Sequence, residues 1–297
     1  MLFNFVLAGA GTMRLMELED TLSPVVWGLR GAGHSVIAFA RQFAPAPAVN
    51  LIVNGGLPEE VGVILAHARE QAGADVCVGL LCPDDLTGTG ALAEAALLHA
   101  AEAVRFVWIC APTAQFDGIL AASRLALVRF GFHPALEGAK PVMEARRTVG
   151  AVLYGDDTPY RAALAERLSQ TAPQSFFVRP GHFPDYIVTD LLSRAALVVV
   201  TRSSDTDGQA PPAARIVKAI CNSVEVVVEA GPGFEAPLAA YTTPWPYDEI
   251  ASRCRAAMQA GGRAEAGARG LSRFRAETSM MQGLEEAIVV AAKAVGG

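Results

Sequence analysis

Short apolar runs alternate with segments of helical spacing along almost the whole chain. Each run stops at glycine, proline or a polar residue, which is typical of a strand buried in a sheet. The segments between the runs repeat apolar residues three or four positions apart, which predicts helices that bury one face. This alternation favours an α/β fold in which helices cover a parallel sheet.

The predicted elements form two series. In the first, we expect strands at residues 3–8, 35–40, 50–53, 76–81, 105–110 and 125–130, and helices at 16–29, 58–71, 91–103 and 115–123. In the second, we expect strands at 149–154, 175–178, 197–201 and 224–228, and helices at 159–169, 186–194, 212–222, 248–259 and 279–295. Thr158 is the expected N-cap of the helix that begins at Pro159.

Two such series predict two Rossmann-like domains. The first domain is residues 1–130, and the second is residues 148–297 with its closing helices. A crossover at 131–147, rich in proline, glycine and charge, joins them. The halves are expected to meet near Phe130-Gly131-Phe132-His133-Pro134.

Composition narrows the class of protein. Hydrophobic residues make up 52% of the 297 positions and charged residues 18%, which is enough apolar surface for two cores. The formal net charge of −6 gives no basic footprint for nucleic acid. No apolar run approaches the roughly 20 residues of a membrane span, and the apolar N-terminus lacks the basic residues of a signal peptide. We therefore expect a cytoplasmic protein without a transmembrane segment.

The chain has five cysteines at scattered positions, an odd number, which is typical of reduced thiols in a cytoplasmic protein. Cys77 and Cys82 lack the second pair of ligands that a zinc site requires. We therefore expect both thiols to pack in the core, and we expect no metal site.

The glycines of Gly9-Ala10-Gly11-Thr12 stand between the first strand and the following helix. Backbone N–H groups at such a helix N-terminus can hold an anion. The full dinucleotide fingerprint needs a third glycine where this chain has Arg14, so that fingerprint fails. Gly9, Gly11 and Thr12 then form either a tight strand-to-helix turn or a loop that faces a cleft between the halves.

The run Arg129-Phe130-Gly131-Phe132-His133-Pro134 is similar to the crossover between the two domains of GT-B-type glycosyltransferases. Residues 149–155 are similar to the first strand and glycine turn of the second domain of such enzymes. Further resemblances lie at 29–36, 190–200, 211–220, 226–229 and 246–251. The resemblance covers most of the chain through short motifs.

The resemblance implies a fold and an activity. Two Rossmann-like domains would face each other across a cleft, and the enzyme would move a sugar from a nucleotide-sugar donor to an acceptor. The acceptor would belong to bacterial cell-envelope glycan or metabolite biosynthesis. Such an enzyme would be metal-independent and would need no cofactor beyond its donor, and its acceptor and oligomeric state stay open.

The resemblance also implies donor-binding residues. Arg215 and Lys218 lie three positions apart, so they share one face of the helix that follows Pro212, and they are expected at the donor diphosphate. The alternative is a solvated helix face. Arg202, Asp207 and Gly208 belong to a polar loop at the carboxyl end of a buried strand, where ligands of open α/β sheets bind.

Three further residues complete the expected site. Glu229 ends the next strand and is expected at the donor ribose, or else is an ordinary strand-end charge. Tyr154 and Gly155 end the first strand of the second half and are expected to line the cleft. For Tyr154 a packed ring with its hydroxyl at the surface is the favoured alternative.

The chain departs from the resembled pattern at the catalytic positions. The acidic residue expected three positions before Arg215 is replaced by Pro212, and no general base stands out, so the catalytic residue is unknown. Asp84-Asp85 is the weak candidate, and a non-catalytic accessory protein with the same fold is the alternative function. A dehydrogenase or epimerase is disfavoured, because no tyrosine is followed four positions later by lysine.

Overall fold

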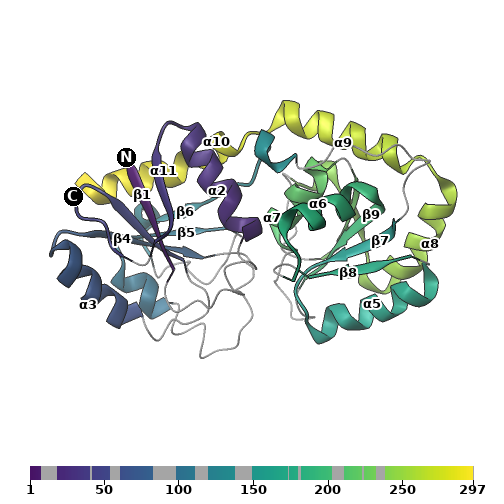
Figure 1. Cartoon of the computed structure of the whole chain (residues 1–297), viewed down its shortest axis with the longest axis horizontal. Helices are drawn as coiled ribbons and strands as arrows, with labels where there is room; N and C mark the ends of the chain where they lie inside the picture. Colours follow the sequence, from purple (N-terminus) through teal and green to yellow (C-terminus); the bar gives the residue numbers. More distant parts are fainter. Residues whose placement is uncertain are drawn as a thin grey trace. The chain divides into compact units, whose positions relative to one another are not determined.

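The computed structural model describes residues 1–7, 19–40, 42–53, 61–82, 98–110, 120–137, 149–172, 174–179, 182–202, 211–222, 224–231 and 238–296 (Figure 1). The chain forms two compact units. Unit 1 comprises Met1–Leu15, Val25–Phe130 and Met280–Gly297, and unit 2 comprises Met16–Pro24 and Gly131–Ser279.

Unit 1 contains one parallel sheet with the strand order β2-β1-β3-β4-β5-β6. Its strands are β1 (Leu2–Leu7), β2 (Ser35–Ala40), β3 (Val49–Val53), β4 (Cys77–Cys82), β5 (Phe106–Ile109) and β6 (Leu125–Leu127). Its helices are most of α2 (Glu19–Gly31), together with α3 (Val61–Ala72), α10 (Met280–Gly283) and α11 (Glu285–Gly296), and residues 98–103 are also helical. Every residue of β3, β4 and β5 is buried, as expected for parallel strands covered on both faces.

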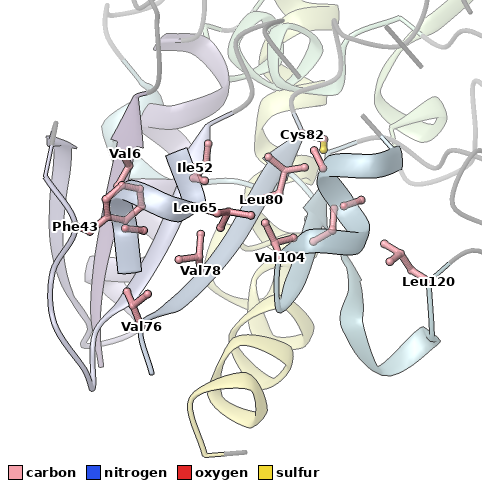
Figure 2. Close-up of a cluster of buried hydrophobic side chains, with 14 of the residues drawn as sticks. Val6, Phe43, Ile52, Leu65, Val76, Val78, Leu80, Cys82, Val104 and Leu120 are labelled. Atoms are coloured by element: carbon pink, nitrogen blue, oxygen red, sulfur yellow. The ribbon is translucent and has the colours of Figure 1, made fainter. Parts of the chain in front are cut away.

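One core of unit 1 lies between the sheet and α3. Figure 2 shows Ile52, Val78 and Leu80 of the sheet gathered with Leu65 of α3 and Val104. The helix α11 packs against three strands of this sheet, β4, β5 and β6 (Figure 1). The C-terminal helix is therefore an integral part of the first unit.

Unit 2 contains a second parallel sheet with the order β11-β10-β9-β7-β8. Its strands are β7 (Val149–Tyr154), β8 (Phe176–Val178), β9 (Ala195–Val200), β10 (Glu225–Glu229) and β11 (Thr243–Trp245). Its helices are α5 (Pro159–Thr171), α6 (Asp185–Arg194), α7 (Ala213–Cys221), α8 (Ile250–Ala260) and α9 (Arg263–Glu277). A core forms where Leu164 and Leu168 of α5 and Ile250 of α8 pack on Leu197 and Val199 of β9.

Most elements predicted from the sequence are confirmed within one to three residues at their ends in the described ranges. Thr158 caps α5, because its side chain accepts from the amide of Arg161. The strand β11 and the helix α9 were not predicted. The division into units differs from the predicted domain ranges in that 280–297 belongs to unit 1 and 16–24 to unit 2. The crossover is described as far as Glu137.

All five cysteines are buried and none forms a disulfide, as the composition led us to expect. Burial raises the pKa of the Cys82 thiol to about 12. Such a thiol packs as a small apolar group. Within the described ranges, no helix is long and apolar enough to cross a membrane.

A close backbone approach fixes α10 in unit 1. The amide of Arg129 donates to the carbonyl of Gly283 at 3.0 Å, and a Cβ on Gly283 would lie 1.7 Å from the carbonyl oxygen of Arg129. Gly283→Ala is therefore expected to destabilise unit 1 by about 1–3 kcal/mol in urea unfolding. The control is Gly62→Ala in α3, where nothing lies within 4 Å of the added Cβ. Equal stability of the two variants would contradict this reading of the contact.

Candidate functional site

The strand order of unit 2 creates a switch point at the carboxyl ends of β7 and β9. The chain continues from β7 to β8 on one side of the sheet, whereas β10 and β11 continue from β9 on the other side. Ligands of open α/β sheets bind outside the carboxyl ends of the strands at such a point. The residues directly after the two strands are Gly155 and Asp156, and Thr201 and Arg202.

Lys218 of α7 is buried and is held by two carboxylates. Its Nζ lies 2.6 Å from Oδ1 of Asp20 and also contacts Oδ1 of Asp185. The hydroxyl of Tyr154, the last residue of β7, donates to Oδ2 of Asp20. Asp20 lies in Met16–Pro24, which is part of unit 2. One carboxylate thus joins the ends of two different elements of this unit.

Arg215 lies on the same helix, three residues before Lys218. Its Nη2 donates to Oδ1 of Asp156 at 2.8 Å, and its Nε lies 4.0 Å from Oδ2 of Asp20. The first contact is a charge-assisted hydrogen bond and the second is a longer ion pair. The side chain is 2% exposed, so both interactions act away from bulk water.

Arg161 of α5 completes the arrangement from the other side. Its Nη1 donates to Oδ2 of Asp156 at 3.3 Å, and its Nη2 donates to the carbonyl of Thr201 at 2.8 Å. The guanidinium passes over Gly155, where an added Cβ would lie 2.7 Å from Nε of Arg161. A glycine at the end of β7 therefore lets this arginine reach from α5 to the end of β9.

These side chains form one charged group, which we call the Lys218 cluster. Its members are Lys218, Arg215, Arg161, Tyr154, Asp20, Asp156 and Asp185. These described side chains comprise three cations and three carboxylates, so their formal charges balance. Balance of this kind is what allows ionised groups to be buried.

The protonation states within the cluster follow from the contacts. Burial opposes the charge of Lys218, yet Asp20, Tyr154 and Asp185 hold the pKa of its ammonium well above the ordinary value. Burial and the nearby Asp20 carboxylate raise the pKa of Tyr154 well above that of a free phenol. Lys218 therefore stays charged, and Tyr154 stays a hydrogen-bond donor.

A second ionic pair lies at the ends of β9 and β10. Oε1 of Glu229 accepts from Nε of Arg202 at 2.9 Å and from its Nη2 at 2.5 Å, and Oε2 accepts from the Arg202 amide at 3.1 Å. The hydroxyl of Tyr160 also donates to Oε1 at 2.5 Å. Burial and Glu229 raise the pKa of Tyr160. Glu229 is fully buried, whereas the side chain of Arg202 is 13% exposed.

Aromatic stacking supports Tyr160 in this position. Its ring stacks on Tyr247 at 4.1 Å between centroids, and the hydroxyl of Tyr247 donates to the carbonyl of Tyr160 at 2.6 Å. The guanidinium of Arg167 lies 4.6 Å from the centre of the Tyr247 ring. The phenol that contacts Glu229 is therefore fixed by packing as well as by its hydrogen bond.

The structure brings several predicted site residues together and corrects two expectations. Arg215, Lys218, Tyr154 and Gly155 meet in or beside the Lys218 cluster, and Arg202 meets Glu229. A solvated helix face for Arg215 and Lys218 is wrong, because both are buried against carboxylates. A surface hydroxyl for Tyr154 is also wrong, because Asp20 accepts that hydroxyl in the interior.

Other predicted positions lie outside the described residues. These are Gly9, Gly11, Thr12, Asp207, Gly208, Asp84 and Asp85. In the part of the chain that the structure describes, no group of three histidine, cysteine or acidic side chains is arranged to hold a metal ion.

Four members of the Lys218 cluster were not singled out from the sequence. Asp156 lies two residues after the first strand of the second series and next to Gly155, so the expectation that ligands bind at strand ends applies to it as well. Arg161 lies on the same helix as Tyr160 and gave no signal beyond ordinary helix composition. Asp20 and Asp185 are 198 and 33 residues from Lys218, and nothing local predicts such ion pairs.

Acid should weaken the Lys218 cluster. Burial alone would raise the pKa of Asp156, but Arg215 and Arg161 outweigh it and lower that pKa. A lowered pKa stabilises the fold above the unfolded value of about 3.9, and this stabilisation is lost as the pH falls through the folded value. Urea unfolding between pH 6 and pH 3 should therefore show a fall in stability that is smaller in Asp156→Asn. The same pH dependence in both proteins would contradict this assignment.

No protein-family model and no curated protein matches the sequence. Solved structures do match the fold. The α,α-trehalose-6-phosphate synthase of Burkholderia multivorans has a TM-score of 0.56 at 10% identity, with 100% of this chain and 98% of that chain covered. AviGT4, a glycosyltransferase involved in avilamycin A biosynthesis, has a TM-score of 0.51 at 13% identity, with the same coverage.

A third match comes from E. coli, a trehalose-6-phosphate protein bound with UDP-2-fluoro glucose. Its TM-score is 0.50 at 10% identity, over 93% of this chain and 77% of that chain. Identities this low show the fold alone. Each unit contains a parallel α/β sheet, which matches the fold of these solved structures and confirms the α/β fold with two Rossmann-like units that the sequence predicts.

Proposed function

We propose that this chain transfers a sugar from a nucleotide-sugar donor to an acceptor, and that unit 2 holds the donor. The observation that carries the proposal is the Lys218 cluster at the switch point of the second sheet. Three donors from α7 and β7 contact one anionic group, the Asp20 carboxylate; they belong to Lys218, Arg215 and Tyr154. A diphosphate bound without a metal needs donors of this kind, fixed in place before it arrives.

The likeness to solved glycosyltransferases supports the same reading. It extends over the whole chain and over nearly the whole length of AviGT4 and of the Burkholderia multivorans synthase. One matched protein is bound with a UDP-sugar. Fold alone does not fix function, so the proposal depends on the site as much as on the likeness.

The second ionic pair suggests how the nucleoside end is held. Glu229 is fully buried and already accepts hydrogen bonds from Arg202 and Tyr160. A ribose hydroxyl could reach this carboxylate only if Arg202 or Tyr160 moved away. We therefore assign Glu229 the role of fixing Arg202, and we assign the donor contact to the partly exposed Arg202. The acceptor is proposed to be a cell-envelope glycan precursor or a small metabolite. The matched enzymes of avilamycin and trehalose 6-phosphate synthesis favour the metabolite.

The test is a titration of purified protein with UDP, GDP and TDP, followed by their glucose conjugates. One nucleotide should bind, and the matching sugar conjugate should be consumed with release of the nucleoside diphosphate. Arg215→Lys should keep part of this binding, because it retains the charge but loses the paired N–H donors. The proposal fails if none of these ligands binds, or if they bind and the Arg215 variant has the same affinity for them as the wild type. Binding without sugar release in the presence of acceptors would favour an accessory protein instead.

A further inference from the structure

The donors of the Lys218 cluster converge on a carboxylate of the chain itself. Oδ1 of Asp20 lies 2.6 Å from Nζ of Lys218. Oδ2 of the same carboxylate accepts from the Tyr154 hydroxyl and lies 4.0 Å from Nε of Arg215. A charged ammonium, a guanidinium and a neutral phenol around two oxygens are the donor set that binds a phosphoryl group.

Asp20 is a remote part of this site. It lies 134 residues from Tyr154 and 198 residues from Lys218 along the chain. Its side chain is 6% exposed, so its charge has little contact with water and depends on these donors. The carboxylate therefore behaves as a ligand that the chain supplies to its own anion site.

The balanced charge makes that ligand an obstacle to another anion. Among the described residues, three carboxylates lie beside the three cations of the Lys218 cluster, so these side chains carry no excess positive charge for a phosphate. An incoming phosphate must replace a carboxylate or be repelled by it.

The three carboxylates differ in how well they could be replaced. Asp156 bridges Arg215 and Arg161 and is tied to the end of β7 two residues after Tyr154. Asp185 contacts Lys218 from a position that is 45% exposed, so water screens it. Asp20 faces all three donors from a buried position. Replacement of Asp20 would release the largest number of donors at once.

We propose that Asp20 is an internal competitor for the donor phosphate: its carboxylate fills the anion site of Lys218, Tyr154 and Arg215, and the donor binds by displacing it. This proposal rests on the proposed function and adds a regulation of the same site. A tethered competitor lowers the apparent affinity by the fraction of time that it occupies the site. Removal of its charge should therefore strengthen phosphate binding, although the same change weakens an ion pair of the folded protein.

The test compares the binding of inorganic pyrophosphate and of UDP by calorimetry in the wild type and three variants. Asp20→Asn keeps the volume and an acceptor for Tyr154, and it should bind both ligands about tenfold or more tightly than the wild type. The matched control is Asp185→Asn, which removes the same charge from the same lysine at an exposed position and should give a smaller gain. Adding Tyr154→Phe to Asp20→Asn should reverse part of the gain. If Asp20→Asn has the affinity of the wild type, or if both single variants gain the same affinity, Asp20 does not compete with the donor phosphate.

A measurement on the wild type keeps the test independent of variant stability. The chain has three lysines, Lys140, Lys218 and Lys293, so the Nζ resonance of Lys218 can be assigned by replacing each lysine with arginine. Pyrophosphate should shift this resonance and leave that of Lys293 in place. If the Lys218 resonance does not shift when pyrophosphate is bound, pyrophosphate does not displace Asp20 from Lys218, and the proposal is wrong.

The two proposals fail in different ways. If UDP and UDP-sugars bind no variant but pyrophosphate binding rises in Asp20→Asn, the proposed function fails and the anion site with its competitor stands. If UDP-sugars bind and turn over in the wild type but Asp20→Asn changes nothing, the proposed function stands and the competitor fails.

Discussion

A Lys218→Met variant is expected to bind a nucleotide-sugar donor about 30-fold or more weakly than the wild-type chain, which corresponds to about 2 kcal/mol or more. Lys218 supplies the ammonium of the anion site, and its raised pKa keeps it charged at neutral pH. Methionine fills a similar volume without a charge or an N–H donor. Calorimetry with UDP or a UDP-sugar measures the change directly.

The matched control is Lys293→Met, the same substitution at an exposed lysine of α11 in unit 1. It should leave the affinity unchanged. Because Asp20 and Asp185 lose a partner when Lys218 is replaced, circular dichroism must show that the variant is folded at the temperature of the titration. Lys218→Arg should recover part of the binding. Equal affinities in both methionine variants would remove Lys218 from the donor site.

Glu229→Gln is expected to destabilise unit 2 by about 3–5 kcal/mol. The substitution leaves Arg202 without its charged partner. It also replaces one of the two carboxylate oxygens, which accept from Arg202 and from the Tyr160 hydroxyl, by an NH2 group that cannot accept, in a place where the glutamate is fully buried. Since the chain has two units, a single unfolding transition need not describe it. Hydrogen exchange of the β9 and β10 amides measures the loss where it occurs.

The chain contains a matched control for this substitution. Glu277 of α9 also accepts from an arginine and a tyrosine, Arg273 at 2.8 Å and Tyr241 at 2.6 Å, but its side chain is 44% exposed. Glu277→Gln should leave the β9 and β10 amides unchanged, because exposed pairs contribute little. If both variants exchange at the same rate, burial does not explain the importance of Glu229.

The sequence predicts the fold well where burial dictates the pattern. The strand β9 is a continuous apolar run because both of its faces are covered, and such runs are hard to mistake. The strand β11 is three residues long with a central Pro244, and it was missed because it is too short for any pattern. The helix α9 was missed because it buries Gly267, Leu271 and Phe274 among many charged residues, which leaves weak apolar spacing.

The site was predicted in part for a similar reason. Local geometry places Arg215 and Lys218 on one face of α7, so their spacing alone suggests that they act together. Their counter-ions come from the loop after β7, from the start of α6 and from the start of α2, and no local pattern links these segments. The burial of the Tyr154 hydroxyl was missed for the same reason, because its acceptor Asp20 lies 134 residues away.

The central claim is that the Lys218 cluster binds the diphosphate of a nucleotide-sugar donor. A crystal structure of the wild-type protein with UDP at saturating concentration tests it most directly. We expect a phosphate oxygen within hydrogen-bonding distance of Nζ of Lys218 and of the Tyr154 hydroxyl, at the carboxyl ends of β7 and β9. UDP bound elsewhere, with Lys218 still held by Asp20 and Asp185 and no phosphate in contact with it, would contradict this claim.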